Sequence, residues 1–362
     1  MLFRSISALG KVFNDKTYHI GGVENGNLKW GANSETGELE AGDGTVILTE
    51  NGVSIWNSNT EIARLGNLNG FLGYTSDTQG IAIGKSTQYM TYDPTNGLRV
   101  YGALTTDREI LIANRTYYVT TGGSDSSDGL TAATAFLTIQ HAIDTASNLD
   151  TRDYDITIQI GNGAYTVSPI ICKDILGSGT VTIVGSTVDL LAVTLTNATG
   201  DVFTASHLTT NYIISGMRII SGGYGIYATH NSHIKIDNIN FGACTTAQIA
   251  AIKKATVEIT DDYTISDDSA YHFYTTEFGY IVYEGSGITV TVADSPDFTT
   301  FAYAEYLAAL YMPNITWSGA ATGQKFYAAM NSIIYVNDGT VGGIDYFPGD
   351  SAGATATGGQ YA

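Results

Sequence analysis

Three short segments, Ile234-Lys-Ile236, Val257-Glu-Ile259 and Tyr280-Ile-Val282, begin 23 residues apart, and each carries an apolar residue at both ends. The same spacing joins two further sets of apolar residues: Phe203, Ile226 and Ile249, and Ile265 and Ile288. Residues 201–292 thus hold about four turns of one repeating unit, which is typical of a solenoid. Because the Leu and Asn consensus of leucine-rich repeats is absent, the pattern favours a parallel β-helix whose like residues stack coil upon coil.

The sequence before this repeat predicts how the solenoid begins. Residues 155–160 and 180–184 alternate apolar and polar side chains and are expected to supply earlier coils. Residues 136–146 carry apolar side chains at helical spacing: Phe136, Ile139, Ala142, Ile143 and Ala146. An open solenoid end exposes apolar core and unpaired strand edges, so we expect this helix to cap it.

The period is lost after residue 300. Residues 303–311 are expected to form either a short helix or a broad apolar patch. The small tail, residues 347–362, is too short to fold alone, so we expect it to pack on a neighbour.

The first 112 residues contain short strands broken by Gly and Asn. Residues 44–56 predict a hairpin, because Asn51-Gly52 is a strong signal for a tight β-turn. Residues 80–84 and 97–102 are further short alternating segments. None can bury a face alone, so we expect them to need partners from later in the chain or from a second copy.

The composition excludes several classes of protein. The 362 residues carry 16 Lys and Arg against 35 Asp and Glu, a net charge of −19, which argues against a nucleic-acid binder. No apolar run approaches the length of a membrane span, and an apolar content of 43% argues against disorder. Gly, at 42 residues, and Tyr, at 24, favour strands and turns over long helices.

Cysteine usage and the start of the chain bear on the compartment. Cys172 and Cys244 fit no zinc spacing, and we expect them to be buried, with a disulfide as the alternative. The first nine residues lack the apolar core of a secretory signal. We therefore expect the chain to be made in a cytosol.

Several segments resemble a known family. Residues 118–143, from Tyr-Val-Thr-Thr-Gly-Gly-Ser-Asp to Ile143, are similar to the entry of the pectin-lyase-like right-handed β-helix of bacteriophage tail spikes and tail fibres. Residues 59–70, 80–84 and 92–102 resemble the shaft sequences of tail fibres. Tyr346-Phe-Pro-Gly and the ending Thr-Gly-Gly-Gln-Tyr-Ala362 resemble the C-termini of phage fibres.

The resemblance implies a role. It implies a homotrimer whose N-terminal part docks to baseplate or tail proteins of the virion and whose distal part binds a polysaccharide on the host surface. The family contains members that cleave glycans and members that only bind them, and these motifs do not separate the two.

Glycan cleavage needs two carboxylates about 5–10 Å apart. The densest acidic cluster lies at residues 261–268, and Glu284 follows Asp261 by 23 residues, so the two could stack on adjacent coils. The candidate catalytic residues are Asp261, Glu284, Asp262, Asp268 and Glu277. The alternatives are solvated corner residues, calcium ligands, or a lyase site that uses Lys253-Lys254.

Tyrosine offers a second signal. Tyr271, Tyr274, Tyr280 and Tyr283 crowd two adjacent strands beside His272. If Tyr280 and Val282 point inward, Tyr283 points outward, and an exposed ring beside polar groups is suited to gripping sugars. The candidate glycan-binding residues are Tyr274, Tyr283 and His272, with an interface between chains or the core as the alternative.

These observations lead to one hypothesis. We expect an all-β protein with an attachment and shaft domain at 1–112, a right-handed parallel β-helix with a capping helix at 113–300, and a β-rich, trimerising tip at 301–362. We expect a virion tail subunit that binds a host glycan without cleaving it, and that needs no cofactor, metal, nucleic acid or membrane insertion. The alternatives are a polysaccharide depolymerase and a structural tail adaptor.

Overall fold

The computed structural model describes residues 18–24, 27–33, 39–41, 46–49, 52–57, 60–85, 88–101, 108–283, 287–336 and 346–362. The chain forms two compact units, Met1–Asp107 and Arg108–Ala362. The division lies beside residue 112, where the sequence analysis places a boundary.

The first unit contains a nine-stranded antiparallel sheet in which sequence neighbours pair. Its strands are β1 (Tyr18–Glu24), β2 (Asn27–Asn33), β3 (Leu39–Ala41), β4 (Val46–Thr49), β5 (Gly52–Asn57), β6 (Thr60–Asn67), β7 (Gln79–Lys85), β8 (Gln88–Asp93) and β9 (Gly97–Tyr101). Thr49 pairs with Gly52, so the predicted hairpin is confirmed, and its turn lies outside the described residues.

One face of this sheet carries a small core. Leu68 and Phe71, from the loop between β6 and β7, cover Ala82, and the Arg64 guanidinium lies 5.1 Å from the centre of the Phe71 ring. From the same loop, the Tyr74 hydroxyl donates to the Asp93 carboxylate at 2.7 Å. This bond, together with those from the N–H groups of Thr95 and Asn96, lowers the pKa of Asp93 to about 2.

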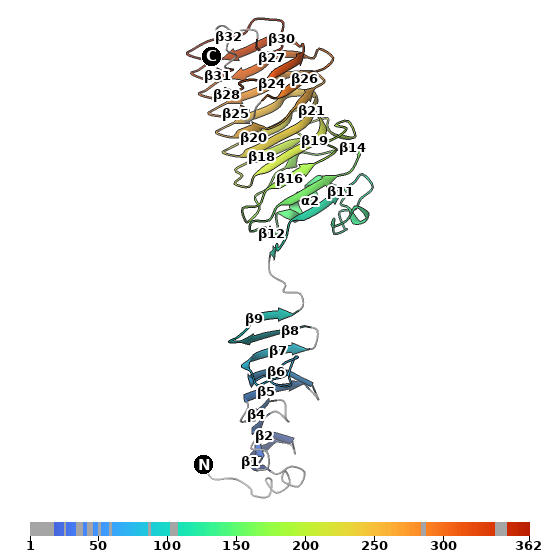
Figure 1. Ribbon diagram of the computed structural model, residues 1–362, viewed down its shortest axis with the longest axis vertical. Coiled ribbons are helices and arrows are strands. Elements are labelled where there is room, and N and C mark those ends of the chain that lie inside the picture. The colour runs from blue at the N-terminus through green and yellow to red at the C-terminus, as the bar shows by residue number, and fades with distance from the viewer. Residues whose placement is uncertain are drawn as a thin grey trace. The chain divides into compact units, whose positions relative to one another are not determined.

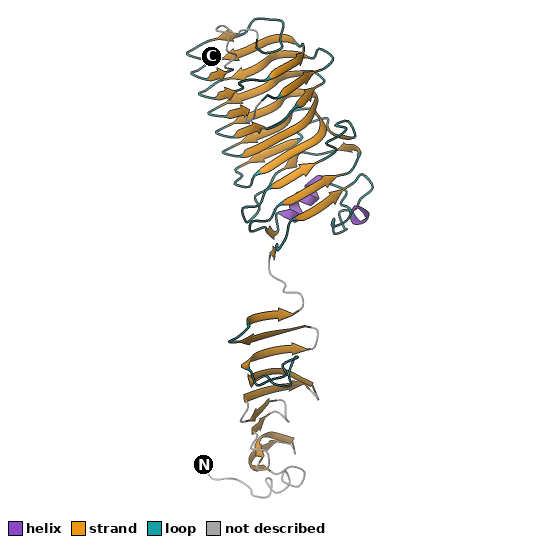
Figure 2. Ribbon diagram, in the orientation of Figure 1, coloured by secondary structure: helices purple, strands orange, loops and turns teal. Residues whose placement is uncertain are grey.

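The second unit is a parallel β-solenoid whose coils follow one another in chain order (Figure 1). Strands dominate it, and its described helices, η1 (Ala132–Thr134) and α2 (Ile139–Ala146), lie beside the first coils (Figure 2). A separate pair of strands, β10 (Glu109–Ile110) and β12 (Leu149–Asp150), precedes the main ladders.

Three parallel ladders form the walls of the solenoid. The first contains β11 (Arg115–Val119), β13 (Ile156–Ile160), β16 (Val181–Val184), the start of β19 (Tyr212–Ser221), the start of β21 (His233–Ile252), β22 (Thr256–Ile259), β25 (Tyr280–Tyr283), β28 (Ala309–Tyr311), β31 (Ile333–Tyr335) and β33 (Gln360–Tyr361). The second contains β14 (Gly163–Thr166), β17 (Val193–Asn197), the end of β19, the middle of β21, β23 (Tyr263–Ile265), β26 (Thr289–Val292) and β29 (Thr316–Gly319).

The third ladder completes each coil. It contains β15 (Ile170–Ile171), β18 (Phe203–Ser206), β20 (Tyr224–Thr229), the end of β21, β24 (Ser269–Thr276), β27 (Asp297–Ala304), β30 (Thr322–Ala328) and β32 (Ala354–Thr355). Because side chains alternate along each strand, every second residue enters a shared core.

The predicted stacking of like residues is confirmed over most of the repeat. Phe203 pairs with Ile226 and Ile226 with Ile249, and all three side chains are buried. Ile234 pairs with Val257 as expected. These columns bury the β-branched and aromatic core that the fold requires.

Two predicted steps are wrong. Val257 pairs with Ile281, so this coil has 24 residues, and Tyr280 pairs with Thr256 instead. Ile265 pairs with Val292, not with Ile288. A shift of one residue, as in the step from Val257 to Ile281, sends the opposite set of side chains inward.

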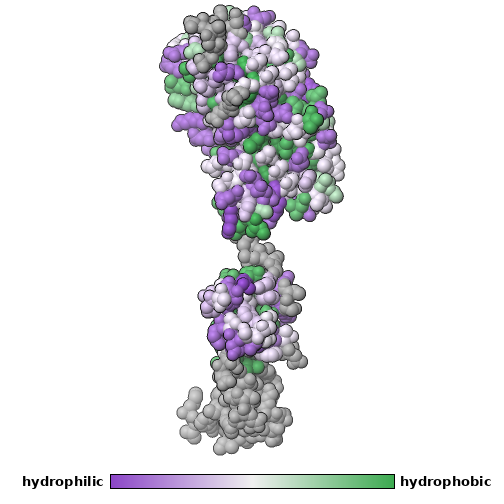
Figure 3. Space-filling model, viewed as in Figure 1, coloured by the Kyte–Doolittle hydropathy of each residue, from purple (hydrophilic) through white to green (hydrophobic). Residues whose placement is uncertain are grey.

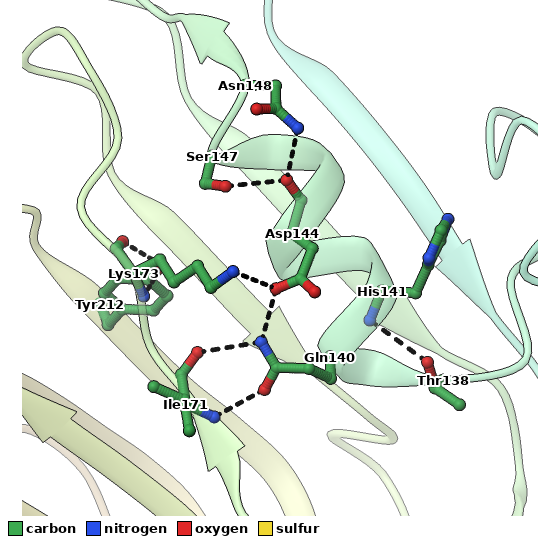
Figure 4. Close-up of polar contacts among 9 residues, drawn as sticks. All are labelled: Thr138, Gln140, His141, Asp144, Ser147, Asn148, Ile171, Lys173 and Tyr212. Carbon is green, nitrogen blue, oxygen red and sulfur yellow. Dashed lines mark hydrogen bonds and ion pairs between the residues drawn. The ribbon is translucent and has the colours of Figure 1, made fainter.

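The predicted capping helix is confirmed as α2, which begins at Ile139 after its N-cap Thr138. Its buried residues are Ile139, Ala142, Ile143 and Ala146. The Gln140 amide donates to the Ile171 carbonyl at 3.2 Å and accepts from the Ile171 N–H at 2.7 Å, so it acts as the missing neighbour of β15 (Figure 4). Asp144 also pairs with Lys173 at 2.9 Å. The helix thus satisfies a strand edge that would otherwise stay open.

The C-terminal residues continue the solenoid. Strands β28 to β33 belong to the same ladders. The described residues after 300 therefore extend the solenoid and do not form the separate tip that the sequence analysis expects. The alternative of a short helix at 303–311 is also wrong, because these residues end β27 and form β28. The tail does pack on a neighbour, since β32 and β33 pair with β30 and β31.

Both cysteines are buried and free, and burial raises the pKa of each thiol to about 12. Among the residues described, no helix has the length and apolar character needed to cross a membrane.

Candidate functional site

The acidic cluster holds the corners of the coil. Asp262 accepts a hydrogen bond from the Thr289 N–H at 2.6 Å, and Asp268 accepts one from the Asp297 N–H at 2.8 Å. The Asp261 carboxylate accepts from the N–H of Asp262 at 2.8 Å. Asp commonly accepts such hydrogen bonds in turns. Those of Asp262 and Asp268 connect one coil to the next.

The structure does not assemble the predicted acid pair. Glu284 lies outside the described residues, so its relation to Asp261 stays a prediction. Glu277 lies on a different corner, next to β24, rather than beside Asp262 or Asp268. Within the described ranges, no group of three or more His, Cys, Asp or Glu side chains could hold a metal ion.

His272 is buried in the core. Gln248 determines which ring nitrogen of His272 carries the proton. The Gln248 side-chain amide donates to the carbonyls of Gly242 and Asp267, so its oxygen is left to accept from His272 Nδ1 at 2.6 Å. His272 Nε2 then accepts from the Tyr263 hydroxyl at 2.7 Å. The prediction that His272 touches a surface ligand is therefore wrong, since its side chain is fully enclosed.

This buried network predicts a pH dependence. Burial holds the pKa of His272 well below its ordinary value, so between that low pKa and 6.5 the unfolded chain binds a proton that the folded chain does not. Stability should therefore fall as pH drops below 6.5, by at most about 2 kcal/mol at pH 5. Urea unfolding of the native chain and of His272→Gln at pH 7 and pH 5 checks this, because other titrating groups are common to both. Equal pH slopes in the two proteins would contradict it.

Tyr283 also lies inside, which corrects the prediction that it points outward. The extra residue in the preceding coil reverses the alternation, and the Tyr283 side chain is only 3% exposed. Its hydroxyl accepts a hydrogen bond from the Ile288 N–H at 3.1 Å.

Tyr274 does lie on the outside of the third ladder, half-buried among other tyrosines. This tyrosine face consists of Tyr224, Tyr227, Tyr271, Tyr274, Tyr303 and Tyr327. The rings of Tyr274 and Tyr303 stack with centres 5.3 Å apart, and Tyr303 stacks on Tyr327 at 5.4 Å. Burial raises the pKa of Tyr224 to about 12, as expected for rings that cover one another. The face suits an interface between chains as well as a sugar platform.

A groove that sequence reasoning missed follows the corner between the third and first ladders. This corner groove has a volume of about 760 Å³. It is lined by the corner pairs Lys253-Lys254, Glu277-Phe278, Tyr306-Leu307 and Met330-Asn331, with His207, His230, Asn231 and Thr357. In the view of Figure 3, apolar residues on the surface of the solenoid form small patches among hydrophilic ones.

The corner pairs share one backbone conformation. Both residues of each pair have positive φ, for example 52° and 66° at Lys253 and Lys254. The second residue of each pair donates its N–H to the first residue of the next coil, as from Lys254 to Glu277 at 3.1 Å and from Phe278 to Tyr306 at 3.0 Å. The corners therefore stack in register at the strand spacing of about 4.8 Å.

This conformation is costly for large side chains. A left-handed residue other than Gly or Asn costs roughly 1–2 kcal/mol, and Gly is abundant in this chain. The corners nevertheless carry Lys, Glu, Phe, Tyr, Leu and Met. Strain of this kind is typically kept where the side chains serve a function.

The side chains of the groove are open to solvent. Phe278, Tyr306 and Leu307 are 55%, 50% and 52% exposed. At the other end, the rings of His207 and His230 stack with centres 4.4 Å apart. Desolvation, His207 and Lys253 together lower the pKa of His230, so its ring is neutral at pH 7 and the positive charge at this end comes from Lys253 and Lys254.

One sequence signal could have revealed the groove. A small buried residue follows the corner pair in each coil: Ser232, Ala255, Gly279, Ala308 and Ser332. The signal is weak, because small residues also mark ordinary turns.

Comparisons of the chain with models of known protein families, with curated proteins and with solved structures find no match.

Proposed function

We propose that this protein is a subunit of a phage tail fibre or tail spike that attaches to a glycan on the host surface, and that the glycan binds in the corner groove. The observation that carries the proposal is the row of large, exposed side chains on strained corners. Phe278 and Tyr306 lie there on adjacent coils, with Leu307 beside them. No structural need of the turn accounts for these residues, since Gly or Asn would form it at lower cost.

The groove fits a sugar chain in shape and chemistry. Pyranose rings have an apolar face that packs on aromatic rings, and hydroxyls that bind polar groups. Asn231 and Asn331 offer amide groups in the same groove. The coil rise of about 4.8 Å is close to the length of one pyranose unit, so successive sugars could meet successive corners.

The first unit supports assembly from several copies. On the face opposite its small core, apolar residues such as Leu65 and Ile83 are 51% and 47% exposed in the single chain. A sheet face of this kind is expected to be covered by a partner. We therefore propose a homotrimer whose N-terminal units associate and dock to baseplate or tail proteins.

We favour binding over cleavage. The carboxylates of Asp262 and Asp268 are engaged in hydrogen bonds to backbone N–H groups of the next coil, and Glu277 lies among cations and apolar side chains. This arrangement suits turn stabilisation better than proton transfer to a glycosidic oxygen.

Glycan binding can be tested with the purified full chain. On an array of bacterial surface polysaccharides, the native protein should bind a subset, and the double variant Phe278→Ala/Tyr306→Ala should bind it at least about 10-fold more weakly, because two stacking contacts are lost. Tyr154→Ala, an exposed tyrosine outside the groove, should bind like the native protein. Equal binding by the native protein and the double variant would remove the groove from the function.

A further inference from the structure

We infer that the corner groove selects a glycan that carries a carboxylate, such as a uronic acid, with the acid group held by Lys253 and Lys254 and the sugar ring packed on Phe278 and Tyr306. This inference rests on the proposed function and names the class of sugar.

Cations in the solenoid are usually paired. Residues 113–362 contain 8 Lys and Arg against 23 Asp and Glu. Lys173, Lys235 and Arg218 each form an ion pair with a carboxylate. Within the described part of the chain, Lys253 and Lys254 form no ion pair within 4.0 Å. Two adjacent cations that stay unpaired in so acidic a protein are suited to an anion from outside.

The two lysines stand one coil from the aromatic side chains. The Lys254 N–H donates to the Glu277 carbonyl at 3.1 Å, which places Lys254 directly before Phe278 in the stack of corners. The coil rise of about 4.8 Å then separates the backbones of Lys254 and Phe278 by roughly one sugar unit. A uronic acid combines an apolar ring face with a carboxylate at its edge, and so matches both groups at once.

Glu277 adds selectivity. It lies between the lysines and Tyr306 along the same row of corners. A polymer with a carboxylate on every sugar would bring one acid group next to Glu277, and like charges in a groove repel. The site therefore favours a glycan whose acidic sugar alternates with neutral ones.

The test uses immobilised bacterial polysaccharides that contain uronic acid, each beside its carboxyl-reduced form. The full native chain should bind the acidic form about tenfold more tightly than the reduced form, as a charge-assisted contact predicts. In Lys253→Asn/Lys254→Asn this preference should fall to about onefold, while binding of the reduced form persists. Asn is chosen because it tolerates positive φ.

Controls separate the inference from the proposed function. Arg152→Asn removes an exposed cation from another positive-φ position, at 51°, and should leave the preference unchanged. Equal binding of acidic and reduced forms by the native chain overturns the inference and leaves glycan binding intact. Failure to bind any polysaccharide of the panel overturns the proposed function and the inference together.

Discussion

Replacing Phe273 by alanine is expected to lower the free energy of unfolding of the solenoid by about 3–5 kcal/mol. Phe273 is fully buried in the column that pairs Ile249 with Phe273 and Phe273 with Ala302. Its ring lies 4.1 Å from the His272 ring and 6.1 Å from the Phe301 ring. Because Ala302 next in the column is small, little can move in to fill the cavity, so the loss should lie toward the upper end of this range.

The matched control is Phe278→Ala, the same chemical change five residues later in the chain. Phe278 is 55% exposed on the corner, so its loss should change stability by no more than about 0.5 kcal/mol. Urea unfolding followed by far-UV circular dichroism measures both variants. Similar urea midpoints for the two variants would contradict the stacked column, since the column buries Phe273 and leaves Phe278 exposed.

The period of the core could be predicted from sequence because it depends only on which residues are apolar. Phe203, Ile226 and Ile249 pair as the spacing indicates. The coil lengths could not, because corners absorb extra residues without disturbing the ladder. Ile281 pairs with Leu310, 29 residues later, and a search for one fixed period ends at such a step. The same irregularity hid the continuation of the solenoid beyond residue 300.

The candidate site was harder to predict for a related reason. The outward direction of Tyr283 depended on counting 23 residues where the coil has 24, and one residue reverses the face of a strand. His272 is polar in sequence, and only the enclosed partners Gln248 and Tyr263 make its burial possible. The corner groove is assembled from residues more than 20 positions apart, which no local pattern unites.

The second large effect concerns the first unit, whose open face carries two columns of apolar side chains. Pairing places Leu65 beside Ile81 and Ile83 beside Met90. The described members of the two columns are Leu48, Val53, Leu65, Ile81, Tyr92 and Leu98, and Val46, Ile55, Ala63, Ile83, Met90 and Val100. Alternation puts Arg64 and Ala82 on the opposite face, where the loop between β6 and β7 already covers the sheet. The open face is therefore the one that the proposed trimer would cover.

Replacing Ile83 by lysine is expected to dissociate the proposed trimer. Each copy would lose a buried isoleucine, worth about 1.5–3 kcal/mol, and would place an unpaired charge in the interface. Light scattering after size exclusion should then report the mass of one chain, 38.4 kDa, where the native protein shows about three times that value. Ile112→Lys makes the same change at a side chain that is 85% exposed in the second unit, so it should keep the native mass. In a symmetric interface the buried charge would be repeated in every subunit, so the trimer should not tolerate it. An Ile83→Lys protein that keeps the mass of the native one would therefore show that further copies of the chain do not cover this face.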